Sequence, residues 1–555
     1  MDTPTDERMD PLLRALAKLG EGSGFLWLVF FLTVTSVLNN GFHAISYVFL
    51  AEVPTHWCSV PELKAANWTE ERIRNVSSLD SCSKYDYNYS FFGKVGFEET
   101  LKFVETHDRP KSSSCDVYSY PGDFKESIVQ TWDLVCDKAT YRTNTQMAQS
   151  LGKLVGASIF GVLSDKYGRK PCFVIGILLL IVSAPATAVV PWYWIYVVTR
   201  FVTGVSNIVM QNSSYTILTE IAGTRSRQWM GIAYSITYPM GMMVLSGAAY
   251  MTNNWRYLQI SIGLPALLLL PHIWYMPESP RWLISQGRRK EAKRILERYY
   301  GPICEDAANM SLSSTHKMGL GNHDDDAEKD ADEKTNFLQK NIKSLRILYS
   351  HFELRKRIAI TYFLWIVASL SYYALALNVD NFSADRYIYV LLTGLTEIPS
   401  YLVPIPILAI LGRRQAGAVL FTISGISLLS IMTISKADTT TILIVGLAGR
   451  FAMSSVYNIV ILHTTELFPT VSRNSAVGTS SAMSHVGSVA APYVADLLGA
   501  IAWWAPSTLC GCLALVASLF CLTLPETRGR PLADTAEEET VKERGFVTFS
   551  NCCKC

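Results

Sequence analysis

Long apolar blocks separated by short polar segments are the main pattern of the 555-residue chain. A helix needs about 20 apolar residues to cross a bilayer, and windows of that length recur from one end to the other. The twelve windows are 25–50, 143–163, 172–190, 193–219, 229–250, 256–276, 358–379, 387–411, 416–435, 440–465, 475–497 and 503–524. Charged or polar residues interrupt those near 143, 387 and 475. The first window is too long, and its flank too acidic, for a cleaved signal peptide. The pattern predicts an all-α membrane protein with twelve spanning helices.

The composition agrees with a protein whose main partner is the lipid bilayer. Hydrophobic residues make up 49% and charged residues 17% of the chain, whereas a soluble domain carries about 25% charged residues. The formal net charge of +2 excludes a nucleic-acid binder, because such a protein carries a clear basic excess.

Basic residues in the short loops predict the orientation of the helices. Loops after even-numbered windows and the one before the eleventh carry Lys166, Arg169, Lys170, Arg225, Arg227, Arg413, Arg414 and Arg473, whereas the short loops opposite carry Arg386 and Lys436. Because Lys and Arg concentrate in cytoplasmic loops, we expect the even loops and both termini to lie in the cytoplasm. The predicted organisation is a tail 1–24, a six-helix half 25–276, a linker 277–357, a second half 358–524 and a tail 525–555.

The insert 52–140 falls on the external side in this arrangement. It contains four cysteines with three possible pairings, namely Cys58, Cys82, Cys115 and Cys136. Three glycosylation sequons lie in it, at Asn67, Asn75 and Asn88, and a fourth at Asn381 follows the seventh window. Glycosylation takes place on luminal or extracellular faces, so the sequons agree with the charge pattern. Reduced cysteines and unused sequons are the alternative.

The linker on the opposite side begins with a basic stretch, Arg288 to Tyr300, which is expected to be helical. It continues into an acidic tract around Asp324–Asp332, whose composition is typical of a disordered segment.

Four short motifs recur at offsets between 244 and 250 positions, each at the same place in a six-window unit. The first copies are Asp165-x-x-Gly168-Arg169-Lys170, Arg200-Phe201, Thr219-Glu220 and Pro277-Glu278-Ser279; the second are Ala409-x-x-Gly412-Arg413-Arg414, Arg450-Phe451, Thr465-Glu466 and Pro525-Glu526-Thr527. Two parallel six-helix halves with a cleft between them form one large class of transporter, in which the halves rock against each other.

The repeated charges predict a cytoplasmic gate. We expect the Asp165 carboxylate to lie against the positive N-terminal end of a neighbouring helix, and Arg169 to pair with Glu220 or Glu466. Arg473 lies on the same side. Since Ala409 stands where the repeat would place Asp, the link in the second half is expected to be weak or absent. The alternative is that these charges fix topology without any switching role.

The motif Gly161-x-x-Ser164-Asp165-x-x-Gly168-Arg169-Lys170 resembles the signature loop of the major facilitator superfamily. The motifs Pro277 to Leu283, Glu466 to Thr470 and Leu524 to Thr527 are similar to those of sugar porters and of the organic cation/anion/zwitterion transporters. The cysteine-bearing insert resembles the second family and not the first. Leu377-Asn378-Val379-x-x-Phe382 and Glu397-Ile398-Pro399 also resemble that family.

This resemblance implies polyspecific movement of small organic ions across the plasma membrane by alternating access, without a cofactor. The chain has no Gly-x-x-x-x-Gly-Lys-Ser/Thr phosphate loop, so we expect no nucleotide, and it has no convincing set of metal ligands. An organic-anion exchanger is the alternative within the family. A non-transporting, receptor-like member is an alternative of another class, and an enzyme is not expected.

Three ionisable residues fall near the middle of predicted spans: Lys153, Glu397 and His485. A charge at this depth costs about 2.5–3.5 kcal/mol, so such residues are expected to face a substrate cavity. The alternative is a structural pair, such as Lys153 with Glu397.

Aromatic residues in the spans predict a site for amines, because aromatic rings attract cations. The family resemblance implies that Trp365, Tyr372, Tyr238, Glu397 and the polar Asn458 line the cavity. It also implies an acidic residue at position 485 in cation carriers and Arg in anion or carnitine-type carriers. A histidine is mostly neutral at pH 7, which favours organic cations or zwitterions over dianions.

The C-terminal Cys552-Cys553-Lys554-Cys555 resembles a palmitoylation site. Unmodified thiols are the alternative.

Overall fold

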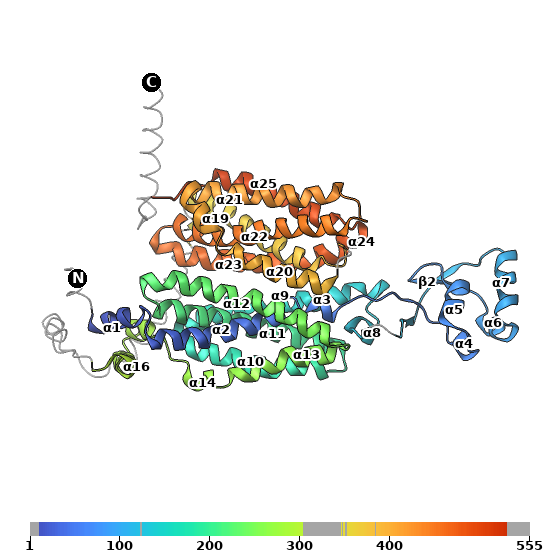
Figure 1. Ribbon diagram of the computed structural model, residues 1–555, viewed down its shortest axis with the longest axis horizontal. Coiled ribbons are helices and arrows are strands. Elements are labelled where there is room, and N and C mark those ends of the chain that lie inside the picture. The colour runs from blue at the N-terminus through green and yellow to red at the C-terminus, as the bar shows by residue number, and fades with distance from the viewer. Residues whose placement is uncertain are drawn as a thin grey trace, which may run out of the picture.

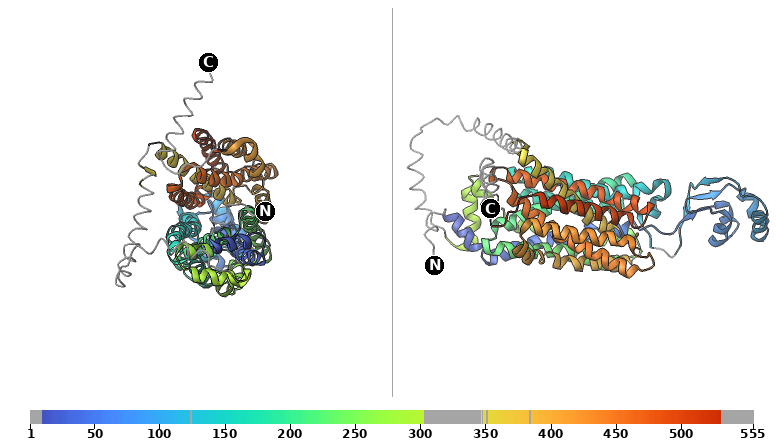
Figure 2. Two further views of the ribbon diagram at one scale, coloured as in Figure 1. Left: turned by 90° about the vertical axis from the view of Figure 1, so that its left-hand side faces the viewer. Right: turned by 90° about the horizontal axis from the view of Figure 1, so that it is seen from above.

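The computed structural model describes residues 10–122, 125–302, 346, 348–349, 352–382 and 385–529. Two layers of long helices lie side by side along a common axis, and a small separate domain projects from one end (Figure 1). One layer holds the helices before the linker and the other the helices after it, as the views from the end and from above also show (Figure 2). The predicted division into two halves is therefore visible in the packing.

The helices coincide with the predicted windows. Those of the N-terminal half are α2 (Gly24–Ala44), α3 (Tyr47–Leu50), α9 (Ala139–Tyr167), α10 (Arg169–Val189), α11 (Tyr193–Ile221), α12 (Thr224–Met251), α13 (Trp255–Gly263) and α14 (His272–Tyr275). Those of the C-terminal half are α19 (Phe352–Leu377), α20 (Arg386–Ser400), α21 (Pro404–Ser430), α22 (Thr439–Leu467), α23 (Thr470–Tyr493), α24 (Gly499–Ile501) and α25 (Ala505–Thr523).

Eight segments of the described chain are long and apolar enough to cross a membrane: Gly24–Leu50, Cys136–Tyr167, Arg169–Val189, Trp255–Tyr275, Phe352–Leu377, Pro404–Thr433, Thr439–Leu467 and Ala505–Thr523. The remaining predicted windows are occupied by α11, α12, α20 and α23, which are helical but shorter or more polar. The polar residues that reduce their apolarity include those that bear on the site below.

Some windows predicted as continuous helices are broken. The window 387–411 divides between α20 and α21 near Pro399 and Pro404, because proline removes a backbone donor and clashes with the preceding turn. Within α21, Gly412 takes a φ of 79°, a left-handed conformation that favours glycine. The chain therefore turns there, and the next helical stretch begins at Arg413.

Glycines allow the central helices to pack closely. A Cβ atom at Gly204 of α11 would lie 2.1 Å from the carbonyl oxygen of Gln149 in α9, and one at Gly152 of α9 would lie 2.1 Å from that of Phe201. Between the halves, α9 packs against α23 and α12 against α20. These two contacts form the interface at which a polar side chain of one half can meet the other.

The projecting domain is built from short elements around a small core. Its helices are α4 (Pro61–Ala65), α5 (Glu70–Ser77), α6 (Tyr89–Val95) and α7 (Phe97–Thr106), and α8 (Ile128–Trp132) leads back to the bundle. Strand β1 (Trp57–Cys58) pairs antiparallel with β4 (Tyr118–Ser119), and β2 (Ser83–Tyr85) with β3 (Ser112–Ser114). The core consists of Val60, Leu63, Ile73, Val76, Tyr89 and Phe92. We call this end of the bundle the disulfide end.

The opposite end, here called the linker end, carries α1 (Pro11–Leu19), α15 (Pro280–Ser285) and α16 (Arg289–Tyr300). The basic stretch is thus helical, as predicted. The Arg289 guanidinium lies 2.6 Å from the Asp10 carboxylate, which joins the N-terminal segment to the linker. The acidic tract and the C-terminal cysteines lie outside the described residues.

Candidate functional site

Two disulfides join Cys58 to Cys115 and Cys82 to Cys136, which selects one of the three possible pairings. The first lies within the projecting domain, and the second ties the domain to the start of α9. The ring of His56 lies beside Cys82 and Cys136, but cysteines bonded to each other offer no thiolate to a metal.

The sequons differ in their surroundings. Asn67, Asn75 and Asn88 are exposed on the projecting domain. The amide nitrogen of Asn381 instead donates hydrogen bonds to Asn378 Oδ1 at 2.6 Å and to the Ala495 carbonyl at 2.9 Å. The atom to which a glycan would be attached is thus engaged inside the helix bundle.

Glu397 lies in a buried network confined to the C-terminal half. Its carboxylate accepts hydrogen bonds from the hydroxyls of Tyr372 at 2.6 Å and Tyr401 at 3.1 Å. The Arg450 guanidinium lies 3.2 Å from the other carboxylate oxygen, and both charged side chains are 2% exposed. Arg450 also donates to the Tyr372 carbonyl at 2.7 Å and covers the Tyr372 ring. Arg450, identified from the sequence only as part of the repeat, therefore neutralises Glu397.

Lys153 does not pair with Glu397, contrary to the structural alternative considered for the sequence. The residue is 6% exposed in the middle of α9. Its ammonium lies 5.6 Å from the ring centroid of Tyr373 in α19, so the side chain reaches from one half toward the other. Among the residues that the structure describes, Lys153 has no ion-pair partner.

Tyr238 of α12 also lies where the halves meet. Its hydroxyl is within hydrogen-bonding reach of Tyr372 and Tyr373 in α19. The three tyrosines thus bring aromatic faces from both halves to one place, and this place adjoins Lys153 on one side and Glu397 on the other.

The other predicted residues lie on the C-terminal half around this place. His485 is half-buried on α23, close enough to Lys153 to experience its charge. Trp365 is 3% exposed and donates its indole N–H to Thr464 at 2.9 Å, so it packs within its own half. Asn458 is half-buried and donates to the Ser454 carbonyl.

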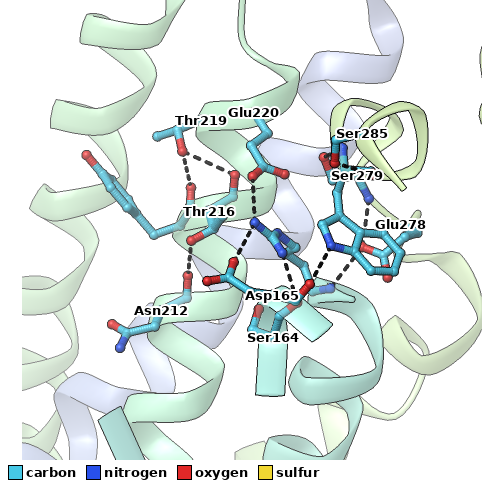
Figure 3. Close-up of polar contacts among 12 residues, drawn as sticks. Ser164, Asp165, Asn212, Thr216, Thr219, Glu220, Glu278, Ser279 and Ser285 are labelled. Atoms are coloured by element: carbon cyan, nitrogen blue, oxygen red, sulfur yellow. Dashed lines mark hydrogen bonds and ion pairs between the residues drawn. The ribbon is translucent and has the colours of Figure 1, made fainter. Parts of the chain in front are cut away.

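At the linker end, the N-terminal half carries the predicted charge cluster with two changes of role (Figure 3). Arg169 lies 3.0 Å from Asp165 and 3.2 Å from Glu220, whereas Glu466 is not its partner. The carboxylate at the helix N-terminus is that of Glu278, which accepts from the backbone N–H groups of Arg169 and Lys170. The prediction that Asp165 caps a neighbouring helix is wrong, because Asp165 is drawn to the guanidinium one turn along and Glu278 takes the cap.

The C-terminal half repeats this arrangement. Arg413 makes a bidentate pair with Glu466, with both distances 2.8 Å, and Glu526 accepts from the backbone N–H groups of Arg413 and Arg414. The expectation of a weak link is therefore wrong, since the missing carboxylate at Ala409 leaves the guanidinium free to bind Glu466 with both arms. Arg473 is half-buried in the first turn of α23.

A second set of ion pairs lies at the disulfide end, and these pairs join the two halves. Arg142 of α9 lies 2.9 Å from Asp380 and 3.8 Å from Asp496. Arg386 of α20 lies 3.0 Å from Glu52 and 3.5 Å from Asp380. Burial raises the pKa of the Glu52 carboxyl, although Arg386 opposes the shift. Sequence reasoning missed this set; the only available signal was that each charge follows or precedes a predicted span.

A cavity of about 330 Å³ opens between the halves toward the linker end. Its walls come from α9 and α11 of the N-terminal half and from α23 of the other half, and Asp165 and Arg169 lie at its margin. The lining includes Gly156, Ser158, Asn212, Ser213, Gly478 and Ser481. The two halves are thus separated by a polar space at the end where their charges pair internally.

Comparisons with known proteins agree with this architecture. A sequence profile of the family described as "Sugar (and other) transporter" matches residues 82–538. The "Organic cation transporter protein" of Drosophila melanogaster is 31% identical over 531 residues, which cover 94% of this chain and 93% of that protein. The "Organic cation/carnitine transporter 2" of Homo sapiens is 30% identical, covering 94% and 92%.

Among solved structures, the partially occluded inward-open conformation of the xylose transporter XylE from E. coli has a TM-score of 0.59 at 17% identity. The alignment covers 92% of this chain and all of that one. This likeness establishes the fold, and the sequence relatives establish transport of small organic ions rather than enzymatic activity. The chain belongs to the organic cation/anion/zwitterion transporter family of the major facilitator superfamily.

Proposed function

We propose that the protein is a plasma-membrane carrier that moves small organic ions by alternating access, in a state closed at the disulfide end. The observation that carries this proposal is the contrast between the two ends of the bundle. Arg142 and Arg386 link one half to the other at the disulfide end. At the linker end, Arg169 and Arg413 pair only with carboxylates of their own half.

The disulfide end faces the extracellular medium in this proposal, and both termini lie in the cytoplasm. Disulfides persist in oxidising compartments, and two of them stabilise the projecting domain or attach it to α9. The exposed Asn67, Asn75 and Asn88 are proposed as glycosylation sites. The engaged amide of Asn381 speaks against a glycan there while this conformation persists.

The proposed substrate region is the place where the three tyrosines of both halves meet. Tyr238, Tyr372 and Tyr373 supply aromatic faces for an ammonium group, which they would attract through cation–π contacts. His485, Trp365 and Asn458 are proposed to shape the same region from the C-terminal half. Glu397 is proposed to act as a polar anchor fixed by Arg450, and not as a free countercharge, because its carboxylate is already neutralised.

Uptake of radiolabelled probes by cells that express the protein tests the proposal. We expect saturable uptake of at least one of choline, carnitine and benzoate, which represent a quaternary amine, a zwitterion and a carboxylate. The matched control is the double variant Asp380→Asn, Asp496→Asn, which loses the carboxylates that bind Arg142 and should reach the surface with reduced uptake. Normal surface expression without uptake of any probe would support the receptor-like alternative instead.

A further inference from the structure

Lys153 is the one ionisable residue of the predicted site that has no countercharge among the described residues. We propose that it is a specificity-determining residue that binds the carboxylate of the transported ion. The inference rests on the proposed function, and it concerns which chemical group of the substrate the N-terminal half recognises.

The position of Lys153 suits this role. It lies in the middle of α9, its side chain is directed to Tyr373 of the other half, and only 6% of the residue is exposed. A lone ammonium in the membrane interior is costly unless it is paired or reaches water. Long lysines near helix ends can reach the interface, but Lys153 lies fourteen residues from either end of α9, which spans residues 139–167.

The balance of buried charge in this region is positive. The Glu397 carboxylate is bound by Arg450, Tyr372 and Tyr401. Arg200 of α11 donates only to neutral partners, Ser46 and Gln146. Between the ends of the described spanning helices of the N-terminal half there is no Asp or Glu, so a substrate anion would supply the missing negative charge.

Polar atoms without partners surround Lys153 on the N-terminal half. His43 of α2 is fully buried, and neither ring nitrogen has a hydrogen-bond partner, while the charge of Lys153 acts on this ring. Gln149 lies one turn before Lys153 on the same face of α9, binds the His43 carbonyl through its amide nitrogen, and leaves its Oε1 unpaired.

Asn207 extends this set from the neighbouring helix. Gly204 of α11 touches Gln149, and one turn further along each helix lie Asn207 and Lys153. Both polar atoms of the Asn207 amide are buried without a partner. Buried polar groups are normally hydrogen-bonded, so His43, Gln149 and Asn207 form a group of donors and acceptors beside an unpaired cation. A carboxylate on Lys153 could accept from the His43 ring and the Asn207 amide.

The opposite wall of the region has a different chemistry. Tyr238, Tyr372 and Tyr373 present aromatic faces, and Lys153 would repel an ammonium placed beside it. An ion with both groups would therefore lie with its carboxylate toward α9 and its ammonium toward α19. An ion with only a carboxylate would use Lys153 alone.

Uptake by substituted proteins tests the assignment. Lys153→Met removes the charge at similar volume, Lys153→Arg keeps it, and Lys166→Met is the matched control, since Lys166 is an exposed lysine of the same helix. In Lys153→Met we expect the KM for carnitine and benzoate to rise about tenfold, with the KM for choline unchanged or lower. Lys153→Arg should retain the carboxylate-bearing probes, and Lys166→Met should match the unsubstituted protein.

Stability of the purified proteins supplies a second measurement. Removing an unpaired buried charge should leave the Tm of Lys153→Met equal or higher in the absence of substrate, whereas a fall would reveal a structural partner and overturn the inference. Carboxylate uptake within about twofold of normal, an equal loss of all three probes, or uptake of choline alone by the unsubstituted protein would also overturn it. Uptake of none of the probes by that protein would contradict the proposed function itself.

Discussion

Charged side chains in the membrane-spanning region differ chiefly in whether a neighbour neutralises them. Glu397 and Arg450 are both 2% exposed and bind each other, whereas Lys153 is buried without such a partner. Breaking a buried pair costs more than the pair contributes, because the remaining charge is left in a medium of low polarity. Glu397 and Lys153, which look equivalent by depth in the sequence, therefore have opposite consequences when they are replaced.

The substitution Arg450→Met should destabilise the protein by about 3–5 kcal/mol, since it leaves the Glu397 carboxylate buried without a countercharge. Thermal unfolding of the purified protein in detergent measures the loss. The double variant Arg450→Met, Glu397→Gln should recover most of it, because no charge is then left unpaired. An Arg450→Met protein with unchanged stability would show that Glu397 is not held by Arg450.

At the scale of the elements, close packing of α9 on α11 sets the separation of the helices that carry Lys153, Asn207 and Arg200. The approach relies on glycine, since a Cβ atom at Gly152 would lie 2.1 Å from the Phe201 carbonyl oxygen. Another glycine of α9, Gly161, has nothing within 4 Å of the corresponding position. The two glycines allow the contribution of packing to be separated from that of helix propensity.

Gly152→Ala should destabilise the protein by about 1–3 kcal/mol, the usual cost of forcing extra volume into a packed core. Gly161→Ala should be neutral or stabilising by up to about 1 kcal/mol, because alanine is the better helix former. Thermal stability and the amount of folded protein after purification measure both effects. Equal effects of the two substitutions would mean that α9 and α11 do not approach closely at Gly152.

On the scale of the whole molecule, the ion pairs at the disulfide end hold the two halves together at that end. Arg142 and Asp496 have side chains only 15% and 14% exposed, so water screens their interaction less than that of a surface pair. Opening this end toward the outside requires these contacts to break. The strength of this network therefore sets part of the balance between the two access states.

Arg142→Gln should shift the population toward an arrangement open at the disulfide end. In a Tyr373→Cys background, a membrane-impermeant thiol reagent added outside the cell should label the new cysteine faster when Arg142 is also replaced. Arg142→Gln without the added cysteine is the control for labelling of native cysteines. Unchanged labelling would indicate that Arg142 does not hold this end closed.

External pH should act on the same contacts. Burial raises the pKa of Glu52 against the opposing effect of Arg386, and Asp380, Lys125 and Arg142 also face it. The closed arrangement thus binds a proton more tightly than an open one in which Glu52 meets water, so protonation favours closure. We expect uptake to fall as external pH decreases from neutral toward the ordinary range of a glutamate. Glu52→Gln should reduce this dependence, and an unaltered pH profile in that variant would exclude Glu52 as its source.

The sequence by itself determined the features that depend on local composition and on repetition. Apolar windows predicted where helices lie, because a bilayer requires a fixed length of apolar helix. The repeat predicted that Glu220 and Glu466 occupy equivalent places, and both bind the arginine of their own half. Motifs such as Gly161 to Lys170 identified the family, since a chain of this architecture keeps its turns and charges at fixed positions.

Only the tertiary structure decided which charges meet. Glu278 and not Asp165 caps α10, since the loop that carries Glu278 folds back onto that helix. Arg142 meets Asp380, 238 positions away, and no local pattern could predict the pair. Lys153 lacks a countercharge because Glu397, at a similar predicted depth, is bound by Arg450. Spacing along the chain gives the depth of a residue, but pairing depends on how helices rotate and pack, and that follows from the fit of all of them together.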